Sequence, residues 1–170
     1  NGYFCQQRLL AAEELLEAAA QKEPKRTATW LLLATVRAGL RDWPGADEAL
    51  ARLDRGQRAD PETKLIEARI RLGQDQPALA EKTLTELLHG PHDADNLPVL
   101  TRARLWLGYA RWAQHDGAGA EREFGEALAM DSDFEPAEIA LAELHMSQSE
   151  PARAWSTSRS RWCSGWAQRW

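Results

Sequence analysis

Branched aliphatic residues are scarce in this sequence, and that scarcity limits the fold class. Valine occurs only as Val36 and Val99, and isoleucine only as Ile66, Ile70 and Ile139. These residues are enriched in strands, whereas the alanine and leucine that dominate this chain are good helix formers. The composition therefore argues strongly against a sheet protein and favours an all-α fold.

Cysteine, long apolar runs and excess positive charge are scarce as well. Cys5 and Cys163 are the only cysteines, and nothing in their spacing suggests a disulfide framework or a metal site. The longest apolar run, residues 30–34, is far too short to span a bilayer, so we expect no direct membrane insertion. The formal net charge of −5 argues against general nucleic-acid binding. No signal segment is recognisable, which leaves the compartment open between the cytoplasm and a bacterial periplasm.

The stretch 101–134, TRARLWLGYARWAQHDGAGAEREFGEALAMDSDF, carries the clearest helical pattern. Apolar residues three and four apart form two stripes in its first half, so the spacing predicts a helix over 102–114 that packs on two sides. Gly108 costs such a helix roughly 1 kcal/mol, which implies that a second helix approaches closely there. We expect Ala120 to be the small residue at that crossing and Phe124 to fill the space beside it.

The same arrangement returns along the chain at a fixed spacing. The alanines in equivalent positions are Ala12, Ala46, Ala80, Ala120 and Ala154. Their separations are 34 residues, apart from one of 40 that a six-residue insertion explains. A period of this length indicates a repeat protein built from helix–turn–helix units.

Within a unit, the residues Leu107-Gly108, Ala120, Phe124 and Ala127 resemble a tetratricopeptide repeat. The resemblance covers residues 1 to about 154 and implies an α-solenoid, a right-handed superhelix of antiparallel helix pairs. The units it implies are a partial repeat at 1–24, repeats at 27–60, 61–88 and 101–134, a degenerate repeat at 135–154, and an insertion loop at 89–98. Asp60-Pro61 comes late against the pattern, so we expect a longer second helix or exit loop before it.

Both ends of the array depart from this pattern. Asn1 falls inside the first helix of its unit, so we expect residues 1–7 to end one helix, residues 9–20 to form a second, and further chain to precede Asn1. The tail at 155–170 loses the helical period and holds four of the eight tryptophans. Three interpretations compete: a native disordered tail, a segment that caps the array, and sequence out of frame with the ancestral gene, which we favour.

In proteins of the resembled family, the first helix of each repeat lines a concave face that binds peptides. The resemblance assigns to this face Arg69, Leu72, Arg102, Leu105, Tyr109, Trp112, Ile139, Glu143 and Met146 in the later repeats, and Phe4, Leu31, Thr35 and Ala38 in the earlier ones. This lining lacks the Lys and Asn with which some members clamp a C-terminal carboxylate. We expect an apolar peptide that is anchored on Tyr109 and Trp112 and oriented by Arg69 and Arg102. The alternative, that the two aromatic residues are packing between repeats, stays open.

No arrangement of side chains indicates catalysis. His89, His92, Asp93 and Asp95 share a loop rich in glycine and proline, but their spacing is a poor match to a closed zinc site. No serine, cysteine or lysine nucleophile has a partner that the sequence reveals. We therefore expect no enzyme activity, no cofactor and no metal.

These patterns predict a non-catalytic scaffold that binds a peptide or partner protein and forms part of a longer protein. The Ala-, Arg- and Trp-rich composition is typical of a bacterial source. A free chain is expected to dimerise through exposed repeat ends, or to be completed by a neighbouring chain. The alternative is an accessory repeat region of a larger enzyme, of a membrane-tethered regulator or of a bacterial envelope or export assembly. A small-ligand sensor is a weaker third reading.

Overall fold

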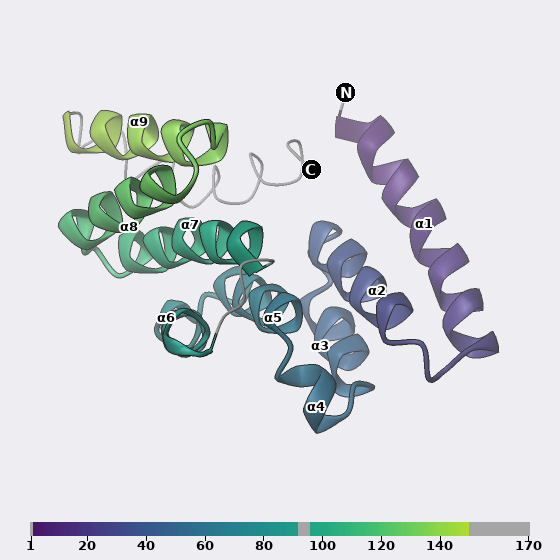
Figure 1. Ribbon diagram of the computed structural model, residues 1–170. Helices are drawn as coiled ribbons and strands as arrows, with labels where there is room; N and C mark the ends of the chain where they lie inside the picture. Colours follow the sequence, from purple (N-terminus) through teal and green to yellow (C-terminus); the bar gives the residue numbers. More distant parts are fainter. Residues whose placement is uncertain (1, 92–95, 150–170) are drawn as a thin grey trace.

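The computed structural model describes residues 2–91 and 96–149, and these residues form helices and no strands. The helices are α1 (Gly2–Lys22), α2 (Thr27–Gly39), α3 (Trp43–Ala51), α4 (Arg55–Arg58), α5 (Pro61–Gly73), α6 (Pro77–His89), α7 (Leu97–Ala113), α8 (Gly117–Met130) and α9 (Glu135–Ser149). The expectation of an all-α fold is confirmed for this part of the chain. Apart from α3 and the short α4, helices that follow each other in sequence pack together, from α1 and α2 at one end to α8 and α9 at the other (Figure 1).

Three helix pairs, α2–α3, α5–α6 and α7–α8, are joined by the same turn. The residue after each first helix's C-cap has a left-handed backbone: φ is 65° at Arg41, 62° at Asp75 and 67° at His115. In each turn its amide bonds the carbonyl three residues back, and the next amide bonds the carbonyl five residues back. This is the Schellman pattern that satisfies the last carbonyls of a helix. The left-handed residues are separated by 34 and 40 residues, so the turns follow the register of the marker alanines.

The second helix of each pair begins with a signal that the sequence carries. Asp42 accepts a hydrogen bond from the Gly45 amide, and Asp116 accepts one from the Gly119 amide. These carboxylates satisfy amides that have no partner inside the helix. In α6, Pro77 starts the helix without a side-chain cap, and proline tolerates this place because it lacks the amide hydrogen.

Three of the marker residues lie where the helices of a pair cross, whereas Ala12 on α1 is only partly buried. Ala46, Ala80 and Ala120 are all 0 % exposed, as is Phe124. A Cβ atom built on Gly108 would lie 2.4 Å from Cε1 of Phe124, which no real structure tolerates. The expected close approach of α8 to α7 at Gly108 is therefore confirmed. Ala154, the last marker, lies outside the described residues.

The expectation that residues 1–7 and 9–20 belong to two separate helices is wrong, because residues 2–20 all lie in the single helix α1. It runs without interruption from Gly2 to Lys22. No proline, glycine or aspartate occurs between residues 3 and 22 to supply the turn that joins the other pairs. Without such a signal, the good helix formers around Arg8 continue the helix.

The connection from α3 to α5 is longer than in the other pairs, as the late Asp60-Pro61 predicted. It contains the short helix α4, which a capping box opens: Asp54 accepts from the Gln57 amide, and the Gln57 side chain accepts from the Asp54 amide. Asp60 then caps α5 through the amides of Glu62 and Thr63.

The loop between α6 and α7 is shorter than expected, because α7 starts at Leu97 rather than near residue 102. Pro98 fits the first turn of a helix, and Val99 is buried at 7 % exposure, so burial draws the extra turn into the helix. Residues 92–95 of this insertion lie outside the described part of the chain.

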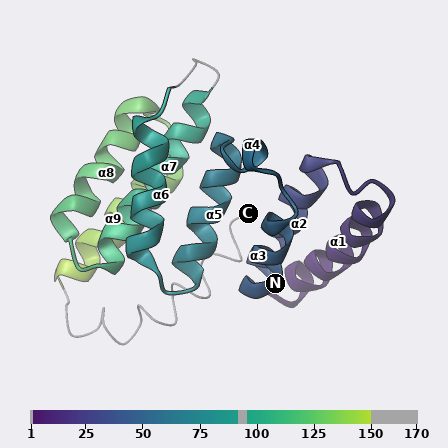
Figure 2. The same ribbon diagram turned by 90° about the horizontal axis from the view of Figure 1, so that it is seen from below.

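The buried side chains form three clusters that follow one another along the chain. One joins α2, α3 and α5, the next joins α5, α6 and α7, and the third joins α7, α8 and α9. Each cluster draws on the next helix in the chain, so neighbouring pairs share their cores. Figure 2 shows helices α5 to α9 grouped together, and these helices pack against one another. No described helix is both long and apolar enough to cross a membrane.

Candidate binding surface

The helices α2, α5, α7 and α9 form a continuous row, in which α2 contacts α5, α5 contacts α7 and α7 contacts α9. We call it the row of first helices, because α2, α5 and α7 open the three pairs and α9 follows α8 in the same register. The eight side chains predicted to bind a partner all belong to α5, α7 and α9. The row therefore brings the predicted residues onto adjacent helices.

Ion pairs at equivalent positions hold successive pairs together. Arg37 Nε lies 2.9 Å from Glu13, Arg71 Nη1 lies 3.2 Å from Asp47, and Arg111 Nε lies 3.3 Å from Glu81. A fourth contact at the same register is weaker: His145 Nε2 lies 3.9 Å from Glu121. The acids lie on α1, α3, α6 and α8, and each contacts a basic side chain on the next helix of the row of first helices, which is α2, α5, α7 or α9.

These ion pairs were not predicted from the sequence, although their acids and bases recur there at a regular spacing. The acids at 13, 47, 81 and 121 keep the separations of the marker alanines, and so do the bases at 37, 71, 111 and 145. The structure also places Glu17 against Arg37. Burial lowers the pKa of Arg37, but hydrogen bonds with Glu13 and Glu17 and the charges of both acids outweigh burial and raise that pKa above its ordinary value.

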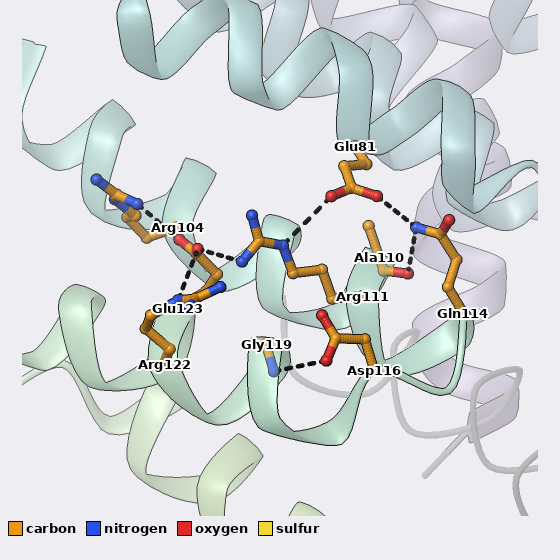
Figure 3. Close-up of polar contacts among 9 residues, drawn as sticks. All are labelled: Glu81, Arg104, Ala110, Arg111, Gln114, Asp116, Gly119, Arg122 and Glu123. Atoms are coloured by element: carbon orange, nitrogen blue, oxygen red, sulfur yellow. Dashed lines mark hydrogen bonds and ion pairs between the residues drawn. The ribbon is translucent and has the colours of Figure 1, made fainter.

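Glu123 is a buried carboxylate at the centre of a second network, drawn in Figure 3. It is 3 % exposed and lies 2.6 Å from Arg104 and 2.7 Å from Arg111. Arg111 therefore joins Glu123 of its own pair to Glu81 of the preceding pair. Because a buried charge needs partners, this network ties α6, α7 and α8 together.

Three of the predicted binding residues on α7 belong to the packing between helices. Leu105 is 3 % exposed and is part of the third core cluster, so it has no surface to offer a partner. Tyr109 meets Phe124 edge-on, with 5.2 Å between ring centroids, and stacks near Trp112 at 6.3 Å. Both aromatic side chains are partly buried against the same cluster. The interpretation of Tyr109 and Trp112 as packing residues fits these contacts better than the interpretation as exposed anchors.

Arg69 and Arg102 are the charged members of the predicted set on α5 and α7. The Arg69 guanidinium lies over the ring of Trp106, 5.3 Å from its centroid, while Arg102 bonds Glu62. Burial lowers the pKa of Arg69, and the positive charge of Arg102 lowers it further. Trp106 was missed from the sequence, yet its position four residues after Arg102 places both on one helix face.

The remaining predicted residues are buried to different extents. Leu72 is partly buried against the core that α5 shares with α6 and α7. Glu143 on α9 is partly buried, whereas Met146 is 59 % exposed. Of the earlier positions, Ala38 is buried at 6 % exposure, and the side chain of Phe4 lies outside the described part.

Two adjoining hollows lie elsewhere, along α3 to α6. The larger has a volume of about 510 Å³ and is lined by Arg58, Lys64, Glu67, Arg71, Leu79, Lys82, Thr83 and Glu86. None of the eight predicted binding residues lines either hollow. The predicted surface is therefore a face of the row of first helices rather than one of these hollows.

The possible metal loop at His89 to Asp95 lies largely outside the described residues. His89 itself is exposed and its Nδ1 is 2.8 Å from the carbonyl of Thr85. Among the described residues, no group of three or more His, Cys, Asp or Glu side chains is placed to hold a metal ion.

Comparison of this chain with models of protein families, with curated proteins and with solved structures finds no match.

Proposed function

We propose that this chain is a tetratricopeptide-like repeat scaffold that binds a peptide or a partner protein on the row of first helices, without catalysis. The observation that carries the proposal is the internal repetition: three helix pairs share one turn geometry, one crossing residue and one ion-pair position. Repeated units that contact only their neighbours build an extended surface, and binding is what such surfaces do in repeat proteins.

The composition of the row supports recognition of a chain that has both apolar and charged groups. Met146 offers exposed apolar area on α9, and methionine adapts its shape to different partners. Arg69 supplies positive charge on α5, while Arg102 on α7 is paired with Glu62. Arg71, Arg104 and Arg111 on the same two helices are also paired with acids, which leaves Arg69 and Met146 as the chemical features of the row.

The experiment is affinity capture from a lysate of the source organism, followed by measurement of the binding isotherm with each purified candidate. The test variant is Met146→Glu, on the row. The matched control is Leu79→Glu on α6, because Leu79 is exposed to a similar extent, 52 % against 59 %. Both variants place one new carboxylate at an exposed apolar position, so neither is expected to change helicity.

A partner whose affinity falls with Met146→Glu and stays the same with Leu79→Glu supports binding on the row. If both variants bind that partner as the wild type does, recognition lies on another surface. If only Leu79→Glu loses affinity, the hollow that Leu79 lines is the binding site and the proposal is wrong.

A further inference from the structure

We propose that Arg69, which lies over the ring of Trp106 and next to Arg102, forms a subsite for the carboxylate of an aspartate or glutamate side chain in a partner peptide. This inference rests on the proposed function, because it names the chemistry that the row of first helices recognises.

Arg69 is exceptional among the arginines of the described residues. Six of them are partly buried, and five contact a carboxylate: these are Arg37, Arg71, Arg102, Arg104 and Arg111. Arg69 is the sixth, and no carboxylate of the described chain lies within ion-pair distance of it. A partly desolvated charge without a counter-ion is unfavourable, and it is the state that an incoming anion relieves.

The surroundings of Arg69 leave it ready to bind. Only its Nε is enclosed without an acceptor, so the two terminal nitrogens keep access to solvent. The guanidinium lies over the indole of Trp106, which is itself 7 % exposed and held in the core. A guanidinium positioned by a fixed ring can offer its two terminal nitrogens to one carboxylate through two parallel hydrogen bonds.

The local charge balance favours a singly charged ligand. Glu62 neutralises Arg102, so the group of Arg69, Arg102 and Glu62 has one uncompensated positive charge. A carboxylate matches this charge, whereas a phosphate dianion would exceed it. The pKa of Arg69 is lowered by burial and by the charge of Arg102, and a bound anion would raise it again by stabilising the charged form.

The position of Arg69 favours a side chain over a chain terminus as the source of the carboxylate. Arg69 lies on α5, with α2 on one side and α7 and α9 on the other. A peptide that crosses the whole row would therefore extend past Arg69 in both directions. We accordingly assign the subsite to an acidic residue within the peptide.

The test is selection from a display library of random peptides that have fixed linkers at both ends, so that no free carboxyl terminus is presented. Wild type, Arg69→Met and Arg69→Glu are used as targets. The control target is Arg71→Met, two residues along the same helix, whose arginine is already paired with Asp47 and Glu67. Circular dichroism confirms that each target keeps its helicity, and Arg69→Met decides the result if Arg69→Glu does not fold.

We expect wild type and Arg71→Met to enrich Asp or Glu at one peptide position, next to apolar residues. Arg69→Met should lose this preference, and Arg69→Glu should replace it with Lys or Arg. A selected peptide, synthesised with an amidated end, should bind Arg69→Met at least about tenfold more weakly than wild type, and its Glu-to-Gln version should bind both targets equally.

Selected peptides without an acidic position, or an acidic preference that Arg69→Met retains, would overturn the subsite and leave the proposed function standing. A preference that appears only with a free carboxyl terminus in the synthetic peptides would overturn the assignment to a side chain. If no target selects any peptide, the subsite and peptide binding on the row are both wrong.

Discussion

Gly108 and Phe124 are in contact across the crossing of α7 and α8, and the glycine hydrogen occupies the space that a methyl group would need. A Cβ atom at Gly108 would lie 2.4 Å from Cε1 and 2.6 Å from Cδ1 of Phe124, whose side chain is fully buried. Phe124 cannot move aside without disturbing the third core cluster. The interaction therefore fixes the distance between the two helices.

Replacing Gly108 with alanine should lower the free energy of unfolding by about 1–2 kcal/mol, because overpacking outweighs the gain in helix propensity. Gly125→Ala in α8 is the matched control, since nothing lies within 4 Å of a Cβ atom there. That variant should gain up to about 1 kcal/mol. Urea denaturation measures both changes, and equal stabilisation by the two substitutions would show that the α7–α8 crossing has room to spare.

The buried carboxylate of Glu123 should contribute strongly to stability. Glu123→Gln leaves Arg104 and Arg111 without their buried counter-ion, although both arginines keep some contact with solvent. We expect the free energy of unfolding to fall by about 2 kcal/mol. Glu126→Gln, an exposed position of the same helix, should change it by less than about 0.5 kcal/mol. Chemical denaturation of both variants tests this, and indistinguishable midpoints would contradict it.

We expect the unpaired charge of Arg69 to lower the free energy of unfolding of this protein. Arg69→Met keeps an apolar contact with Trp106 and removes an unpaired charge, so we expect stability to rise by about 1 kcal/mol. Arg71→Met removes a paired charge from the same helix and should lower stability by about 0.5–1 kcal/mol. Thermal unfolding followed by circular dichroism gives the order of the three proteins. A loss of stability in Arg69→Met would mean that the cation–π contact outweighs the cost of burying the charge.

Helix α1 has an apolar stripe that no described helix covers. Leu15 is 74 % exposed, and Ala19 is exposed although its counterparts in the other units, Leu53, Leu87 and Ala127, are at most 5 % exposed. We expect the chain to dimerise through this stripe at high concentration. Light scattering should show a rising mass for wild type and for Leu79→Lys, and a monomer for Leu15→Lys. A wild-type protein that stays monomeric at every concentration would rule the contact out.

Several features of the fold could be predicted because their causes are local. Helices α2, α5 and α9 begin at residues 27, 61 and 135, which are the predicted starts of their units. The crossing of Gly108 with Phe124 also followed from spacing alone. Caps, prolines and the apolar period act within a few residues, so the sequence displays them directly.

The sequence alone therefore determined that the described part of the chain is helical, where α2, α5 and α9 begin, and which small residues lie at the helix crossings. Only the tertiary structure decided that Leu105 is enclosed in the core, and that Arg69 lies over Trp106 while the other partly buried arginines contact acids. The physical reason is that the charge balance of a side chain depends on groups from several helices. The helical period of the sequence places Arg69 on one face of a helix. Only the packing of α5 against α7 shows that the charge of Arg69 has no carboxylate partner in the described part of the chain, whereas that of Arg102 does.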